Sequence, residues 1–266
     1  MTNYSTPYAS SPQPRALFVS PAYRFYAGPL LTIEPHRSSA PCIVASWDGD
    51  FSIDSDGHRH CGSAFYLAPG LRRAADFGDR LPLVLYVEPG SMACARLRAA
   101  FGPLDAECPP IPLDPAPWRS LAARVMAARQ VDEISAAIDA TLGEVLPGLA
   151  PPLDGRILDL LAHLHGEKVN LPQLSASRLR HLCVEQIGVP PHRYDIWLRL
   201  CQALRVFMRE GSLTAGAVEA GFADSAHFTR TFRGAYGIAP SVSLESVIAS
   251  VRMDSQAFDR PFPFFR

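Results

Sequence analysis

The chain has 266 residues, of which 48% are hydrophobic and 19% charged, and its formal net charge is −1. This length accommodates two modest domains, and the apolar content suits ordinary soluble cores. The overall charge excludes nucleic-acid binding through bulk positive charge, so any DNA affinity must come from locally placed arginines. Residues 151–266 hold 13 basic and 11 acidic residues, and all the basic ones except Lys168 are Arg.

Six cysteines are scattered along the chain without a C-x-x-C pair. They are Cys42, Cys61, Cys94, Cys108, Cys183 and Cys201. The first residues are polar and rich in Pro and Ser, unlike a signal peptide, and no apolar run reaches membrane-spanning length. We therefore expect a cytoplasmic protein with no membrane partner, whose thiols are free and mostly buried.

Residues 1–14 have little to bury and are predicted to form a disordered tail. From Arg15 onward, short apolar or alternating runs are separated by Gly, Pro and Asp turns. The runs are Ala16–Ser20, Leu30–Glu34, Cys42–Trp47, Asp50–Asp54, Ser63–Leu67 and Leu81–Glu88. Strands at this spacing predict an antiparallel barrel or sandwich over 15–101, with hairpin tips at Trp47–Phe51 and Ile53–Gly57.

After Pro89 the pattern becomes helical. Helices are expected at Ser91–Phe101, Trp118–Ala128 and Val131–Leu146, and the last carries the apolar stripe Ile134, Ile138, Leu142 and Val145. This stripe is a candidate dimer surface, and the alternative is that it packs within its own chain. The Pro- and Gly-rich segment Pro147–Gly155 is the best candidate for an interdomain linker.

The C-terminal part is predicted to be helical. Helices are expected at Arg156–His165, Ser175–Gln186 and Tyr194–Arg209. Ser212 then opens a short helix that ends at Gly221, and Asp224 caps a second helix that runs from Ser225 to Ala235 and ends at Gly237. Phe228 and Phe232 form the inner stripe of this second helix. Two short helices with a Gly-containing turn predict a helix-turn-helix.

The string GFADSAHFTRTFRGAYGIAPS, residues 221–241, resembles the C-terminal signature of AraC/XylS-type transcription regulators. That signature reads roughly G-F-x-[DS]-x-x-[HY]-F-[ST]-R-x-F-[KR]-x-x-[FY]-G-x-x-P-S. The resemblance covers residues 156–241 and implies two helix-turn-helix units joined by one long helix. Ile196–Phe207 matches that connecting helix, with Arg199 and Ala203 at family-like positions. The N-terminal half looks like the cupin-type sensory barrel of such regulators.

The first unit's recognition helix would be Ser175–Gln186, where LSASRLRHL is close to the family pattern L-S-x-S-R-L-x-x-L. The family usually places a complete helix directly before it, and here about a helix's worth of residues is missing. Either Leu158–His165 serves as the scaffold helix with a looped turn after it, or the unit is truncated.

The resemblance also implies which residues contact DNA. In the second unit the positions are Ser225, Ala226, His227, Thr229, Arg230 and Arg233, and in the first unit they are Ser177, Arg180 and His181. Arg230 can donate a fork to guanine or to phosphate, and Thr229 can meet a thymine methyl group. The alternative is that these residues form a solvated helix face.

Other chemistry has less support. His36, His58 and His60 raise the question of a cupin metal site, but related barrels often carry Pro-Gly-x-x-His where this chain has Pro69-Gly70-Leu71-Arg72-Arg73, and Arg is no metal ligand. We expect no metal or cofactor. Arg72 and Arg73 are either an anionic-effector site or a solvated turn. The sequence contains no G-x-S-x-G, H-E-x-x-H, Walker or G-x-G-x-x-G motif, so we expect no enzyme.

The sequence therefore predicts an α+β chain with a cupin-like antiparallel β-barrel followed by an all-α domain with two helix-turn-helix units. The predicted divisions are 1–14, 15–101, 102–150 (a helical linker region), 151–242 (the DNA-binding domain) and 243–266 (a C-terminal tail). The predicted function is a sequence-specific transcription regulator controlled by a small-molecule effector in the barrel. Expected partners are double-stranded DNA, RNA polymerase and a second copy of the chain. The alternatives are a metal-dependent cupin enzyme with a helical appendage and a helical adaptor that has lost DNA binding.

Overall fold

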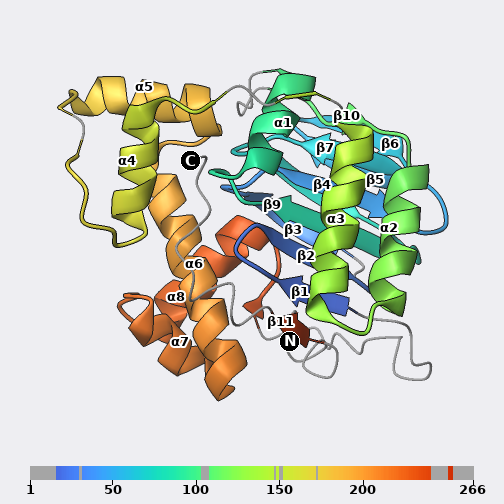
Figure 1. The fold of residues 1–266 in the computed structure, drawn as a ribbon. Helices are drawn as coiled ribbons and strands as arrows, with labels where there is room; N and C mark the ends of the chain where they lie inside the picture. The colour runs from blue at the N-terminus through green and yellow to red at the C-terminus, as the bar shows by residue number, and fades with distance from the viewer. Residues whose placement is uncertain are drawn as a thin grey trace.

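The computed structural model describes residues 16–29, 32–102, 108–146, 148–149, 152–171, 173–240 and 251–253. The predicted tail 1–14 lies outside these residues, as do parts of the predicted linker Pro147–Gly155 and most of 243–266. Figure 1 shows a β-sheet body on one side of the molecule and a group of helices on the other. The predicted class, an antiparallel β region followed by a helical domain, is confirmed.

The strands form two sheets. The seven-stranded sheet has the order β10-β7-β4-β9-β2-β1-β11, and the four-stranded sheet has the order β3-β8-β5-β6. The first contains β1 (Ala16–Val19), β2 (Tyr23–Ala27), β4 (Cys42–Ser46), β7 (Ala64–Leu67), β9 (Pro82–Val87), β10 (Ile111–Pro112) and β11 (Val251–Met253). The second contains β3 (Thr32–Arg37), β5 (Phe51–Ser55), β6 (His58–Gly62) and β8 (Arg72–Asp76). All described pairs are antiparallel except β1 with β11, and no ladder among these strands closes the two sheets into a barrel.

Each of the six runs predicted as strands overlaps a strand. The short strands β10 and β11 were not predicted, and neither were β2, β6 and β8. Their apolar pattern is interrupted by ionisable residues, of which Arg24 in β2 and Arg73 in β8 turn out to be buried. The hairpin tip at Ile53–Gly57 joins β5 to β6 through Asp56 and Gly57, both with positive φ, as a two-residue hairpin loop requires. The tip predicted at Trp47–Phe51 is wrong, because that segment passes from one sheet to the other.

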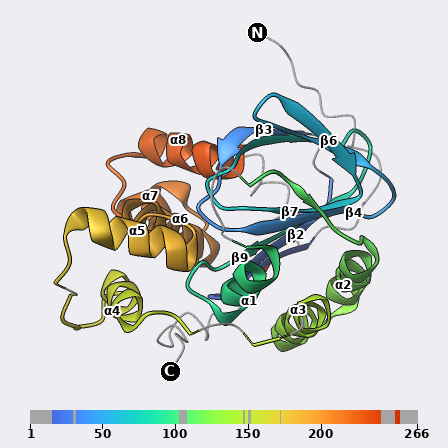
Figure 2. The same cartoon turned by 90° about the horizontal axis from the view of Figure 1, so that it is seen from above.

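The central strands of the larger sheet are buried on both faces. In β4, Ile43 and Ala45 belong to a core with the helices that cover one face, while Cys42 and Val44 belong to a core shared with the smaller sheet and the C-terminal helices. The covering helices are α1 (Met92–Phe101), α2 (Ala116–Ala127) and α3 (Val131–Val145). Figure 2 shows them on the face of the larger sheet opposite β3 and β6.

The apolar stripe of α3 packs within its own chain. Ile134, Ile138 and Leu142 are at most 2% exposed and share the core of the covering helices and the sheet. The stripe is therefore no free surface for a dimer, which corrects that part of the sequence prediction. Much of the region predicted as a linker, 102–150, is a layer of the sheet body.

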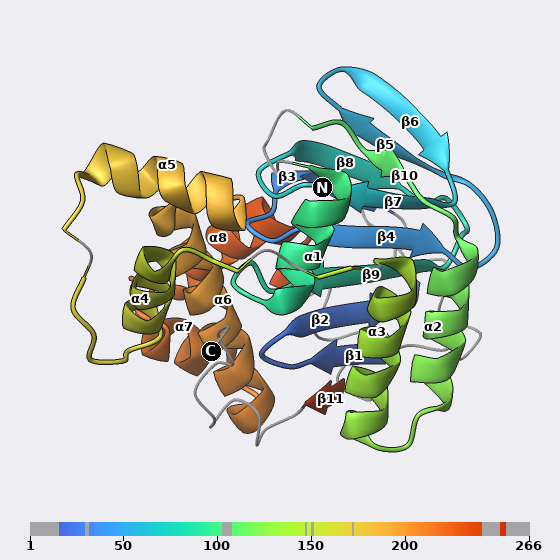
Figure 3. The same ribbon diagram turned by 45° about the horizontal axis from the view of Figure 1, so that its top comes forward.

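The helical part begins with α4 (Gly155–Leu164) and continues through α5 (Ala176–Ile187), α6 (Pro191–Glu210), α7 (Leu213–Glu219) and α8 (Ser225–Tyr236). These helices agree with the predicted ones to within a few residues. Pro191 stands at the first position of α6, where its missing N–H and fixed φ do no harm. Figure 3 shows α4 to α8 beside the edge of the sheet body that includes α1, β2 and β3.

Phe232 tests the packing of α8. Its side chain is 4% exposed, with ring centroids 5.7 Å from Phe228 and 4.6 Å from Tyr236. Phe232→Ala should lower the free energy of unfolding by about 3–5 kcal/mol because it leaves a cavity in this aromatic row. Thermal and denaturant unfolding followed by circular dichroism measure the loss. Val218→Ala is the control, since Val218 is 65% exposed, and equal midpoints for the two variants would contradict the assigned register of α8.

Candidate nucleic-acid interface

The unit formed by α7 and α8 is defined by side-chain caps and glycines. The Ser212 hydroxyl accepts a hydrogen bond from the Ala215 N–H at 3.2 Å, and the Asp224 carboxylate accepts one from the His227 N–H at 2.5 Å. Gly221, with a φ of 74°, lies in the turn between the helices. Such caps satisfy N–H groups that the first helical turn leaves free. The predicted ends of both helices are confirmed.

Helix α6 holds this unit from behind. Arg199 donates from Nε to the Ala220 carbonyl at 3.0 Å and from Nη2 to the Gly221 carbonyl, and its guanidinium lies 4.7 Å from the centre of the Phe222 ring. Gly216 allows α7 to touch α6 directly, since a Cβ there would come within 2.5 Å of the Ala203 carbonyl oxygen. Arg199 and the close approach of α7 to α6 at Gly216 thus fix the turn between α7 and α8 on α6.

The outward face of α8 carries the residues predicted to contact DNA. Ser225, Ala226, Thr229, Arg230 and Arg233 are exposed. His227 is half-buried and packs edge-on against Phe222, with ring centroids 5.4 Å apart. Opposite them, the ring of Phe228 is 1% exposed. The structure brings all six residues onto one short helix whose other face is anchored in the core.

The first unit consists of α4 and α5 with a connection that contains no helix among its described residues, 165–171 and 173–175. Ser175 caps α5, and Leu182 and Cys183 on α5 pack in one core with Ile157 and Leu161 on α4. Helix α4 therefore acts as the scaffold helix with a looped turn after it. The predicted contact residues Ser177, Arg180 and His181 lie exposed on α5.

The two predicted recognition helices, α5 and α8, belong to units that are connected by α6. In Figure 1, α6 extends from the neighbourhood of α4 and α5 to α7, with α8 beside it. The C-terminal turn of α5 also reaches the sheet body, because the Arg98 guanidinium on α1 lies 3.4 Å from the Glu185 carbonyl.

Strand β3 of the sheet body contacts the C-terminal end of α8. The Glu34 N–H donates to the Gly237 carbonyl at 2.8 Å, and the Glu34 carboxylate forms a two-point ion pair with Arg233, with one contact of 2.6 Å. No residue with a side chain fits in place of Gly237, because its Cβ would lie 2.5 Å from the Glu34 carbonyl oxygen. Arg233, a predicted DNA contact, is thus held by an acid of the N-terminal half in this structure. Hydrogen bonding to Arg233 lowers the pKa of Glu34.

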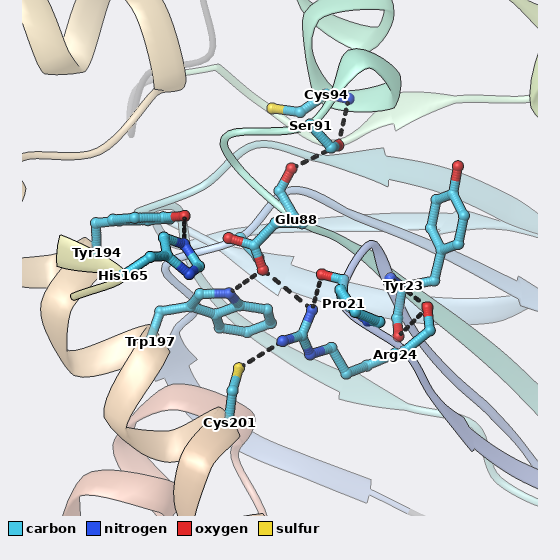
Figure 4. Close-up of polar contacts among 12 residues, drawn as sticks. Pro21, Tyr23, Arg24, Glu88, Ser91, Cys94, His165, Tyr194, Trp197 and Cys201 are labelled. Carbon is cyan, nitrogen blue, oxygen red and sulfur yellow. Dashed lines mark hydrogen bonds and ion pairs between the residues drawn. The ribbon is translucent and has the colours of Figure 1, made fainter. Parts of the chain in front are cut away.

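A buried polar cluster joins the sheet body to α6, and Figure 4 shows its members converging from β2, the end of β9 and α6. Arg24 and Glu88 form an ion pair at 3.0 Å with side chains 7% and 1% exposed. The indole N–H of Trp197 donates to the same Glu88 oxygen at 2.7 Å. Burial raises the pKa of Glu88, and the neighbouring Arg24 and the donated hydrogen bonds oppose this rise.

The other side of the Arg24 guanidinium is covered by α6. It lies 4.8 Å from the centre of the Trp197 ring, a cation–π distance, and its Nη2 is 2.7 Å from the Cys201 sulfur. Nearby, a 3.0 Å hydrogen bond joins the His165 Nε2 to the Tyr194 hydroxyl. Burial, followed by the Arg24 charge, lowers the pKa of His165 to about 4. His165 is therefore neutral at physiological pH, which suits a site that already holds one guanidinium.

The sequence did not single out this cluster. Its only signals are an arginine within the aromatic run YRFYA of β2 and an acid directly after the apolar strand β9. Neither signal specifies a partner, because the partners Trp197 and Cys201 lie more than a hundred residues further along the chain.

The histidines and arginines considered for a metal or an anion site lie on strands of the smaller sheet. His58 and His60 lie on β6 at the edge of the smaller sheet, while His36 lies on β3 at its other edge. No group of three His, Cys, Asp or Glu side chains suited to a metal ion occurs among the described residues. Arg72 is exposed, but Arg73 is 3% exposed and faces the Cys42 sulfur and two carbonyls. The interpretation as a solvated turn is therefore wrong for Arg73.

Among the described residues, no helix has both the length and the apolar character needed to cross a membrane. The six cysteines are all free thiols, and Cys42, Cys94, Cys183 and Cys201 are buried.

Comparisons with known proteins agree with a helix-turn-helix domain in the C-terminal part of the chain. Residues 172–246 match a family model described as a helix-turn-helix domain. Among solved structures, unsaturated fatty acid-bound wild-type ToxT from Vibrio cholerae strain SCE256 matches with a TM-score of 0.51 and 12% identity, over 87% of this chain and 98% of that chain. ToxT from Vibrio cholerae O395 bound to (E)-4-(8-methylnaphthalen-1-yl)but-3-enoic acid matches with a TM-score of 0.51 and 12% identity, over 84% and 98%. At such identities the likeness shows the fold alone. No sequence of a curated protein matches the chain.

The Arg24–Glu88 pair generates a prediction for the contact between the two halves. Arg24→Met should lower the free energy of unfolding by about 3–5 kcal/mol, because it leaves the Glu88 charge buried without its partner. Adding Glu88→Gln to that variant should restore at least half of the loss, since the amide oxygen still accepts from Trp197 and no charge remains. Denaturant unfolding of the two single variants and the double variant measures the coupling. A double variant no more stable than Arg24→Met would contradict the claim that the unpaired Glu88 charge causes the loss of stability.

Proposed function

We propose that this chain is a transcription regulator of the AraC/XylS type and that it reads its operator through α8 and α5, with α8 as the stronger reader. The observation that carries the proposal is the exposed face of α8, which presents Thr229 and Arg230 from a helix capped at both ends and fixed on α6. Arg233 lies on the same face and is paired with Glu34 in this structure, so it can reach DNA only after leaving that acid. A recognition helix needs this combination of an accessible donor face and a rigid base.

Individual roles follow from side-chain chemistry. Arg230 can donate two parallel hydrogen bonds to guanine or to phosphate, and Thr229 can contact a thymine methyl group or a phosphate. Ser225, Ala226 and His227 stand in the first turn of α8, where they approach the bases together with backbone N–H groups suited to phosphate. Ser177, Arg180 and His181 take the corresponding places on α5.

The rigid α6 determines the spacing of the operator. Two recognition helices that read one DNA face must enter successive major grooves, so the subsites should lie about 10–10.5 bp apart, or closer on bent DNA. The first unit uses a looped connection of residues 165–175 in place of a helix. A recognition helix with less support orders its contacts less well, so we expect α5 to contribute less specific free energy than α8.

The sheet body is the proposed control region. We assign 15–150 to sensing a small-molecule effector and 151–242 to DNA reading, and the contacts of Arg24, Glu88 and Glu34 with the helices support such coupling. In the two ToxT structures, the bound molecules are an unsaturated fatty acid and a substituted butenoic acid. RNA polymerase in the cytoplasm is the proposed protein partner, and in vitro transcription from an operator-bearing template, with and without the chain, checks it.

The prediction for DNA binding concerns Arg230. Arg230→Ala should weaken specific binding by about 1–3 kcal/mol and relax the base preference at one position of one subsite. A fluorescence-anisotropy titration against a base-by-base operator library measures both effects. Arg59→Ala is the matched control, since Arg59 is an exposed arginine on the β5–β6 hairpin paired with Asp54.

The same operator library tests whether α8 and α5 contribute unequally to the free energy of specific binding. Arg180→Ala and His181→Ala should weaken the other subsite by less than Arg230→Ala weakens its own. Equal losses would show that α5 is as well supported as α8, and no loss would show a single-unit reader. Wild-type affinity and base preference for Arg230→Ala would refute the assignment of α8.

We also propose a homodimer formed through the N-terminal half, with a surface other than the buried α3 stripe. Sedimentation equilibrium of the full chain at micromolar concentration should give twice the 29.0 kDa chain mass. A single-chain mass, both alone and with one operator, would contradict the dimer.

A further inference from the structure

A groove of about 470 Å³ lies between the sheet body and the DNA-reading helices. The sheet body contributes His36, Arg37 and Arg72, while α6 contributes His192, Arg193 and Ile196, and the C-terminal half of α8 forms the remaining wall. The groove is therefore built from both functional halves of the chain. Any ligand in it would touch the strand β3 that also contacts the end of α8.

The groove is lined by positive charge without a compensating acid. Among the described residues that line it, none is an Asp or a Glu. Arg37 donates to the Gly70 carbonyl at 2.8 Å, and no ion pair within the described part of the chain involves Arg37, Arg72 or Arg193. The acid next in sequence on β3, Glu34, is engaged by Arg233.

Two further features increase the positive potential. Arg73 is buried beside the groove residue His36, its pairing partner across β3 and β8, and its described contacts are carbonyl oxygens, the Cys42 sulfur and the Tyr86 side chain, none of which is an acid. His192 and Arg193 also stand in the first turn of α6, where the helix dipole is positive. Like charges gathered in this way repel one another. Burial, followed by the nearby Arg37, lowers the pKa of Arg193.

We propose that this groove binds a compact anion that carries a phosphate group or several carboxylates. Guanidinium groups bind both through paired, charge-assisted hydrogen bonds, and three of them converge here from two halves of the molecule. The apolar part of the wall is small, consisting of Pro35, Ile196 and Ala235, so it offers little to a long hydrocarbon chain.

The assignment of this anion as the effector rests on the proposed function. An anion that contacts Arg37 and Arg193 together bridges β3 to α6 and removes their mutual repulsion. Its binding is then linked to the placement of β3 against α8, and through it to DNA affinity, with the same coupling factor in both directions. The binding of the anion itself needs no DNA and can be measured separately.

Isothermal titration of the full chain with pyrophosphate, citrate and oleate tests the proposal. We expect saturable binding of pyrophosphate or citrate, weakened at least about tenfold in Arg37→Gln and in Arg193→Gln. Arg59→Gln should bind as the native chain does, because it removes an exposed arginine that does not line the groove and lies on β6, at the other edge of the smaller sheet from β3. Binding of oleate alone, or equal affinity in all variants, would overturn the proposal.

Thermal unfolding keeps the test decisive if a variant folds poorly. Without anion, Arg37→Gln and Arg193→Gln should match or exceed the native midpoint, since each removes one of two repelling charges. Pyrophosphate or citrate should raise the midpoint of the native chain and of Arg59→Gln, but not that of the groove variants. Groove variants that lose operator affinity and keep anion binding would show that the groove contacts DNA phosphate instead. If neither anion binds the native chain while Arg230→Ala still weakens its DNA binding, this inference alone would be overturned and the proposed function would stand.

Discussion

The buried pair of Arg24 and Glu88 is the contact on which the arrangement of the molecule depends. Two charges removed from water are tolerated only when further hydrogen bonds and close packing compensate them. Here the compensation comes from α6, which supplies the Trp197 indole to the carboxylate and the Trp197 ring and Cys201 sulfur to the guanidinium. Separating α6 from the sheet would leave both charges without these partners. The pair therefore specifies where the connecting helix sits on the sheet body.

That placement determines where the surfaces proposed to read DNA stand. Arg199 and Gly216 fix the second unit on α6, and Leu182 packs α5 against α4 within the same core. The sheet body reaches α8 at a second point, through Glu34 and Gly237. The exposed Glu34 contact can exchange with water far more readily than the buried pair can. The contacts between the two halves thus include a buried pair and an exposed one, and the cationic groove lies beside the exposed one.

Local signals predicted the second helix-turn-helix well because its determinants are close in sequence. Ser212, Gly221, Asp224 and Gly237 act on backbone groups within a few residues, so their effect does not depend on the rest of the fold. The strands β2 and β8 were not predicted, because their determinants are far apart in sequence. Arg24 and Arg73 interrupt their apolar patterns, and only partners from distant segments make these arginines suitable for burial.

By itself, the sequence determined the α+β class, the positions of the C-terminal helices and the residues on the outward face of α8, because each depends on periodicity and capping within a short segment. Only the tertiary structure decided that the α3 stripe is internal, that α4 supports α5, and that Arg24 pairs with Glu88 under Trp197. It also decided that Arg37 and Arg193, some 150 residues apart in the printed sequence, line one groove. Such contacts depend on how helices and sheets pack, and an amphipathic stripe or a single charge does not encode which distant surface will cover it.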